Sequence, residues 1–87
     1  MALNFLNTCR SFDPERRSLS FWGHDNTFEV AFILDESALH HLSGLEEVGE
    51  ATASVVFDRH RTQIWNAARR VYQKTSKRSC PISAADL

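Results

Sequence analysis

The sequence predicts a small α+β domain, in which a small antiparallel β-sheet, made of a hairpin and edge strands, is packed by a short and a long α-helix. Three observations support this prediction. Residues 18–22 and 27–34 place apolar side chains at every second position, and so on one face, with the period of a strand. Residues 35–44 carry the start and stop signals of a short helix over about 35–42. Residues 51–77 contain no glycine or proline and repeat apolar residues at helical spacing.

The length of 87 residues predicts a single domain over residues 1–87, because so short a chain supports one core. Hydrophobic residues make up 43% of the chain and aromatic residues 10%, which is typical of a packed core and not of a disordered tail. A chain of this size buries only about 60–65% of its extended surface. A partner subunit would add burial, so a homodimer is one of the assemblies that we consider.

The first half of the hairpin follows a turn. Residues 13–15 read Asp-Pro-Glu, a turn signal, because proline fixes φ near −65° and aspartate accepts hydrogen bonds from the following amides. Residues 1–12 suit a short edge strand or an extended lead-in. After the turn, residues 18–22 form a strand with Leu19 and Phe21 on one face.

Residues 23–26 are predicted as the hairpin loop, and residues 27–34 as the clearest strand. One set of its side chains must face the core: Phe28, Val30, Phe32 and Leu34. Residues 80–83 are expected to return as a last strand beside the hairpin.

The short helix has recognisable ends. Asp35 is a good N-cap, and Leu34 with Leu39 matches a hydrophobic staple. Ser43 and Gly44 end the helix. Residues 45–50 form either a loop or an early turn of the next helix, since Ser43 and Glu46 also fit a capping box.

The long helix is expected over residues 51–77, with one apolar stripe made by Ala53, Phe57, Ile64, Ala67, Ala68 and Val71. A straight helix of that length measures about 40 Å, which is long for a domain with a radius of gyration of roughly 12 Å. Residues 73–78 are wholly polar, so we expect this end to fray.

The two halves of the chain differ in charge. Residues 1–50 carry three arginines and nine acids, hence −6, while residues 51–80 carry seven cations and one acid, hence +6. The long helix therefore has a basic face, whose candidate residues for binding nucleic acid or another partner are Arg59, Arg70, Lys74 and Lys77. The alternative is that these cations form the solvated side of an amphipathic helix.

Opposite charges also suit a dimer, in which the acidic residues 35–50 of one subunit meet the basic helix of another, although neutralisation within one chain is equally compatible. Trp65 and Tyr72, seven residues apart, are the candidate dimer contact or else part of the core. His60 is expected to be a buried neutral histidine, and Arg61 to anchor the helix to an acid of the hairpin or of residues 46–50.

No catalytic, cofactor-binding or metal-binding site is predicted. Cys9 and Cys80 lie far apart and are interpreted as reduced thiols. His40 and His41 are adjacent on a helix, hence about 100° apart, and are poorly placed to bind one metal ion. No apolar run approaches the length needed to span a bilayer, so no membrane contact is expected.

A family resemblance rests on residues in a fixed order: Phe12-Asp13, the hairpin, Ala38-Leu39, the run Phe57-x-x-His60-Arg61-x-x-Ile64 leading to Ala68, and residues 82–87. This order resembles the bacterial domain of unknown function (DUF) 1488 family, whose members are short, stand alone and have a hairpin followed by helices. The resemblance covers nearly the whole chain through diffuse hydrophobic patterns. It implies an α+β fold and a bacterial cytosolic setting, and it supplies no catalytic residues.

These observations predict a cytoplasmic, non-enzymatic binding or regulatory accessory domain. The alternative is a nucleic-acid-binding protein that uses the basic face of the long helix. An enzyme is the third possibility, and it would need a deep pocket lined by His60, an acid and Cys80.

Overall fold

A hairpin of β3 (Ser18–Asp25) and β4 (Phe28–Leu34) forms the centre of the sheet in the computed structural model. The structure describes residues 3–5, 10–25, 28–44, 48–75 and 79–87. Pairing runs from Leu19 opposite Leu34 to Asp25 opposite Phe28, so β3 continues through residues that the sequence analysis assigned to the hairpin loop. Asn26 of the predicted loop and Thr27, the first residue of the predicted strand, lie outside the described residues.

The alternation of the hairpin places one side of each strand in the core. Leu19, Phe21, Val30, Phe32 and Leu34 are all buried, as predicted. Phe28 is the exception. It was predicted to face the core with the other three residues of its face of the strand, but it is the first residue of β4 and is 53% exposed.

Gly23 lies inside β3, where the ring of Phe5 covers the strand. A Cβ at this position would come within 2.9 Å of Phe5 Cε1 and 3.1 Å of Leu3 Cδ1. Glycine is therefore required by the close approach of another segment, and this explains why a strand contains a residue that favours loops.

Three edge strands complete a mixed sheet. β1 (Leu3–Asn4) and β2 (Arg10–Asp13) both pair antiparallel with β3, and β5 (Ser79–Ile82) pairs with β4. The predicted return strand is thus confirmed, but it runs parallel to β4. The connection from β4 to β5 passes through all three α-helices, and such a crossover returns the chain in the same direction.

The first helix, α1 (Glu36–Ser43), begins and ends as its sequence signals predict. Asp35 is the N-cap, and its Oδ1 accepts a hydrogen bond from the amide of Ala38 at 2.9 Å. Leu34 and Leu39 are both fully buried, as a hydrophobic staple requires. Gly44 ends the helix with a φ of 72°, which is the left-handed region that glycine adopts without strain.

The structure corrects the prediction of one long helix. The chain instead forms α2 (Glu50–Arg59) and α3 (Arg61–Thr75), separated at His60, whose φ of −109° and ψ of 23° are not helical. A straight helix of about 40 Å would be longer than the largest dimension of the domain, 36 Å. The bend lets both halves of the apolar stripe reach one core.

The structure shows where the helical region begins and ends, which the sequence left partly open. Gly49 is the N-cap of α2, so Val48 and Gly49 are not helical, while residues 45–47, including Glu46 of the possible capping box, lie outside the described residues. At the other end, α3 continues through Thr75, so the predicted fraying does not begin at Gln73. Residues 76–78 are also outside the described part.

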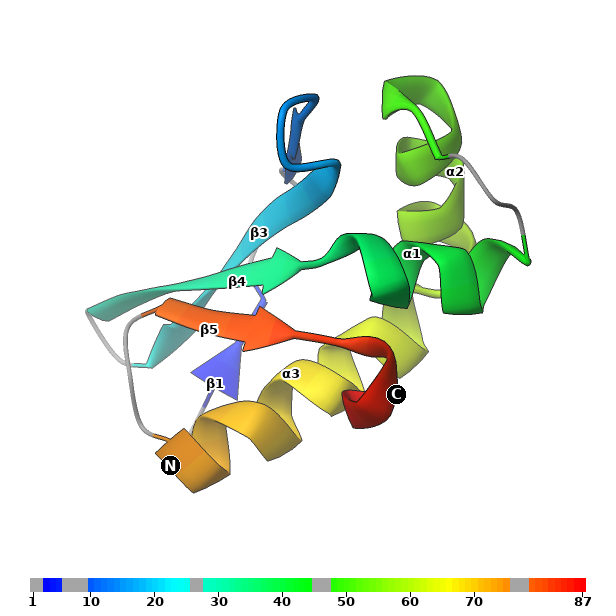
Figure 1. Ribbon diagram of the computed structural model, residues 1–87. Helices are drawn as coiled ribbons and strands as arrows, with labels where there is room; N and C mark the ends of the chain where they lie inside the picture. The colour runs from blue at the N-terminus through cyan, green and yellow to red at the C-terminus, as the bar shows by residue number, and fades with distance from the viewer. Residues whose placement is uncertain (1–2, 6–9, 26–27, 45–47, 76–78) are drawn as a thin grey trace.

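In the view of Figure 1, α3 runs below the sheet, α1 follows β4 beyond its end, and α2 stands upright on the right. α2 and α3 therefore point in different directions. α2 contacts β2 and α3 contacts β5, while α1 contacts α2 and the 3₁₀-helix η1 (Ala84–Asp86). The predicted apolar stripe is confirmed, because all six of its residues are buried: Ala53, Phe57, Ile64, Ala67, Ala68 and Val71.

A substitution at Gly23 tests the packing of the sheet. Gly23→Ala places a methyl group against the Phe5 ring, which cannot move freely because it stacks on Trp65 with 4.8 Å between ring centroids. We expect the free energy of unfolding to fall by about 1–3 kcal/mol, as measured by urea denaturation followed by circular dichroism. Gly49→Ala is the control for an added methyl group with no neighbour within 4 Å, and its expected cost is only the weaker N-cap of α2, below about 1 kcal/mol. Equal stability of the two variants would contradict the packing described here.

Candidate binding surfaces

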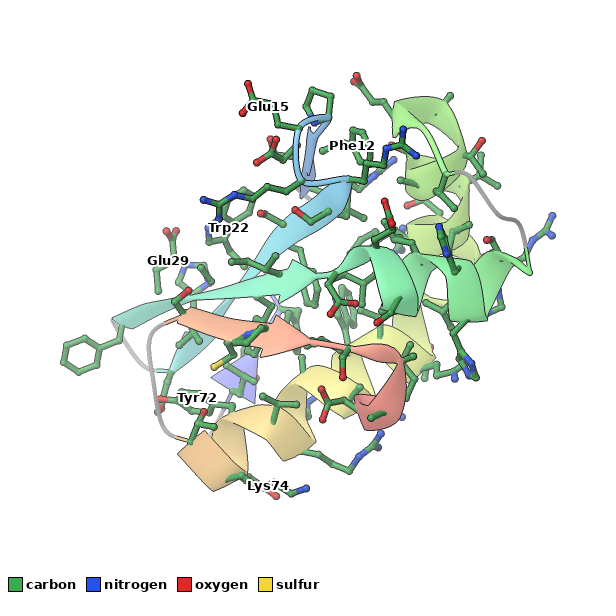
Figure 2. All side chains as sticks on the ribbon, in the orientation of Figure 1. Phe12, Glu15, Trp22, Glu29, Tyr72 and Lys74 are labelled. Atoms are coloured by element: carbon green, nitrogen blue, oxygen red, sulfur yellow. The ribbon has the colours of Figure 1, made fainter. Side chains whose placement is uncertain are left out.

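The structure brings three of the four predicted basic residues onto one surface. Arg59 is the last residue of α2, and Arg70 and Lys74 lie on α3; all three are exposed. Lys77 lies outside the described residues. We call this region the basic surface and define it by Arg59, Gln63, Asn66, Arg70 and Lys74. Figure 2 shows Lys74 on the side of α3 that faces away from the sheet.

The charge of α3 makes this surface positive. The helix carries Arg61, Arg69, Arg70 and Lys74, and its 15 residues include no Asp or Glu. The Nη1 of Arg69 donates a hydrogen bond to Asn66 Oδ1 at 3.3 Å, and Arg69 also lies over the Phe5 ring, 5.2 Å from its centroid. Arg69 is therefore held by its neighbours, although it is exposed, as are Arg70 and Lys74.

A shallow depression on this surface has a volume of about 440 Å³ and is lined by polar side chains only: Arg59, His60, Thr62, Gln63, Asn66 and Arg70. None of these described lining residues is a carboxylate. The Nη2 of Arg70 donates a hydrogen bond of 2.8 Å to the backbone oxygen of Asp86, which holds this guanidinium at the rim. The depression therefore offers cationic and neutral donors without an internal counter-charge.

Another hollow shows a different charge pattern. Between the β2–β3 turn and the start of α2, a hollow is lined by Phe12, Pro14, Arg17, Val48, Gly49 and Glu50. Figure 2 shows Phe12 between that turn and α2. This lining contains one cation and one acid, so it has no net charge to select a ligand.

The structure corrects the expected burial of His60. The residue is half-buried at the α2–α3 bend, where its amide donates to the oxygen of Val56 at 3.0 Å and its own oxygen accepts from the amide of Ile64 at 2.9 Å. Its backbone thus ends one helix and begins the next. Its side chain lines the basic depression and a neighbouring hollow.

That neighbouring hollow lies between α1 and α2 and was not found from the sequence. It has a volume of about 210 Å³, and its lining residues are Leu42, Ser43, Thr52, Val55, Val56, Arg59 and His60. Val55 is 56% exposed, which is unusual for a large aliphatic side chain in this protein. Leu42 and Val55 belong to different helices, so no spacing in the sequence indicates that they share a pocket.

Arg61 anchors the bend, but through a partner nearer in sequence than expected. Its Nη2 donates to Asp58 Oδ1 at 3.0 Å, and Asp58 Oδ2 accepts from Arg10 Nη2 at 3.1 Å. Arg61 also lies over the ring of Trp65, 5.8 Å from its centroid. Asp58 therefore links the end of α2 to the start of α3 and to β2.

Trp65 and Tyr72 both pack against other parts of the domain. Trp65 is half-buried and stacks on Phe5, with 3° between the ring planes. Tyr72 is only 8% exposed, and its hydroxyl donates to Asp25 Oδ2 at 2.7 Å. Both side chains join α3 to the N-terminal segment and the sheet, which is the core alternative of the sequence analysis.

The face of the sheet opposite α3 presents apolar side chains that the sequence analysis did not use. Trp22 pairs with Ala31 across β3 and β4, and Ile33 pairs with Pro81 across β4 and β5. Trp22, Ala31 and Ile33 are half-buried, and Pro81 is exposed. Figure 2 shows Trp22 on the side of the sheet away from Tyr72.

The titratable residues form no metal centre within the described ranges, where no three His, Cys, Asp or Glu side chains are grouped to bind an ion. Cys80 is buried in β5, with its Sγ 3.6 Å from Thr75 Oγ1. Asp86 accepts hydrogen bonds from the amide and hydroxyl of Ser83, at 2.9 and 3.3 Å, and so holds η1 in place. None of the described helices is both long and apolar enough to cross a membrane.

Comparison with known proteins identifies the family. No curated protein and no solved structure matches the chain. A family model described as "Protein of unknown function (DUF1488)" matches residues 3–83. The match extends from β1 through β5 and so includes the hairpin, all three α-helices and the bend at His60. The chain therefore belongs to the DUF1488 family.

Proposed function

We propose that this chain is a non-enzymatic binding or regulatory accessory domain that contacts an anionic partner through the basic surface. The observation that carries the proposal is the carboxylate-free depression between Arg59 and Arg70. Arg59 makes no ion pair with any described residue, so its charge is available to a partner. A bacterial cytoplasmic setting, which the family resemblance implies, is part of this proposal.

Charge alone does not give such a surface high affinity. Exposed ion pairs contribute about 0–1 kcal/mol each, although they accelerate association and select partners of opposite charge. The basic surface therefore accounts for recognition and orientation, and apolar contact must supply the rest of the binding free energy. A protein partner can provide both kinds of contact.

Reversal of the Arg59 charge tests this proposal. Arg59→Glu should lower the recovery of a native partner at least about tenfold in affinity capture from the source cytoplasm with quantitative mass spectrometry, because the negative side chain repels an anion. Arg16→Glu is the matched control, since Arg16 is an exposed arginine in the β2–β3 turn. Equal recovery by both variants would remove the basic surface from the proposal.

Nucleic-acid binding is the second candidate function. It is favoured by three exposed cations, Arg59, Arg70 and Lys74, that follow one another along a helical surface without acids on α3. Side chains so arranged suit successive phosphates of a backbone.

A salt titration tests this second candidate. Binding of a fluorescein-labelled DNA duplex or RNA strand, followed by anisotropy, should weaken with a slope of about −3 in log affinity against log salt concentration, as three phosphate contacts require. Arg70→Gln should reduce the magnitude of that slope by about one. Absence of binding at low salt would end the nucleic-acid hypothesis.

A homodimer remains a prediction. Tyr72 is only 8% exposed and offers little surface to a second chain, whereas Trp65 is half-buried and keeps part of its surface in solvent. Sedimentation velocity at high protein concentration should give twice the mass of one chain if the dimer forms. A single species with the mass of one chain across the concentration range would refute it.

A further inference from the structure

Two hollows of different chemistry meet at the α2–α3 bend. The polar depression of the basic surface and the hollow between α1 and α2 share two lining residues, Arg59 and His60. A ligand that occupies both hollows therefore passes directly over the Arg59 side chain. We propose that the two hollows form one groove that binds an acidic peptide segment carrying an apolar anchor residue.

The inference rests on the proposed function, because it names the class of partner that the basic surface takes. It adds an apolar subsite to a surface that was otherwise defined by its charge. We call the two hollows together the composite groove.

The apolar half of the composite groove suits a single side chain. Its floor is formed by Leu42 of α1 and by Val55 and Val56 of α2. The volume of about 210 Å³ is below the roughly 300–1,000 Å³ typical of sites for whole small molecules. Val55 leaves more than half of its surface in water, and an apolar anchor would remove that surface from solvent.

The cationic half selects carboxylates. Arg59 stands at the boundary of the two hollows, and Arg70 is held at the far rim by its hydrogen bond to the backbone of Asp86. A guanidinium presents a planar fork of donors that matches a carboxylate. Since no described lining residue of either hollow is an Asp or Glu, an acidic segment meets complementary charge along this half.

The lining favours a peptide over a nucleic acid. Proteins that bind single strands stack bases on aromatic side chains, and no Phe, Tyr or Trp lines either hollow among the described residues. The aromatic residues nearest in sequence, Phe57 and Trp65, point into the domain, where they contact Phe21 and Phe5. The aliphatic lining beside two arginines instead matches a peptide in which an aliphatic side chain is flanked by acidic residues.

A set of four labelled peptides tests the composite groove. The first probe is a fluorescein-labelled eight-residue peptide with one leucine among glutamates. The second replaces the leucine by serine, the third replaces the glutamates by glutamine, and the fourth carries both changes. Fluorescence anisotropy with the full chain should show that the first peptide binds at least about tenfold more tightly than the second and the third.

Two variants assign these preferences to the two halves of the groove. Val55→Ser should reduce the leucine-over-serine preference to nearly one and leave the glutamate-over-glutamine preference intact. Arg59→Gln should do the reverse. Phe28→Ser and Arg16→Gln are the matched controls, because each changes an exposed residue of the same kind outside the groove. Circular dichroism confirms that each variant is folded.

Specific outcomes would overturn the inference. Equal affinity for the leucine and serine peptides, an unchanged preference in Val55→Ser, or no binding up to about 1 mM peptide would each refute the composite groove. Tight binding of labelled RNA or DNA that competes with the first peptide and is lost in Arg59→Gln would show a nucleic-acid site instead. If the peptides fail while Arg59→Glu still loses its native partner, the inference falls and the proposed function stands.

Discussion

The bend at His60 is the constraint on which the rest of the structure depends. It turns one apolar stripe into two helices that bury Phe57 and Ile64 in the same core. Asp58 supports the bend by accepting hydrogen bonds from Arg61 in the next helix and from Arg10 in β2. The turn between the helices is thereby tied to an edge of the sheet, so sheet and helices position each other.

Aromatic contacts fix Phe5, the residue after β1, between the sheet and α3. Phe5 stacks on Trp65 of α3 and lies within 6.1 Å of the Phe21 ring centroid. Its ring also covers Gly23, where a larger residue would not fit. These contacts, together with the hydrogen bond from Tyr72 to Asp25, join the two aromatic residues of α3 to the rest of the domain. The exposed side of α3 therefore carries cations and uncharged polar residues but no acid.

The same bend shapes the surface that we propose for binding. Because α2 ends at Arg59, this arginine lies between the hollow under α1 and the depression along α3. A continuous helix would place Arg59 in a regular polar row with Gln63, Asn66 and Arg70, whereas the bend turns α3 away from α2 directly after this residue. Packing of the core and the chemistry of the surface are therefore two consequences of one local departure from helical geometry.

Features that depend on neighbours along the chain can be predicted from the sequence. These are the α+β class, the alternation of the hairpin, the caps of α1 and the apolar stripe of the helical region, and each follows from spacing, caps or turn chemistry. The basic character of α3 can also be predicted, because charge is a property of composition.

The break at His60, the parallel direction of β5 and the place of Gly23 inside a strand depend on tertiary packing. Each of these features involves segments that are distant in sequence. The small size of the domain does not accommodate one straight helix, and the crossover from β4 makes β5 parallel to it. The ring of Phe5 lies so close to position 23 that only glycine fits there. The composite groove belongs with them, because its apolar and cationic sides come from three different helices.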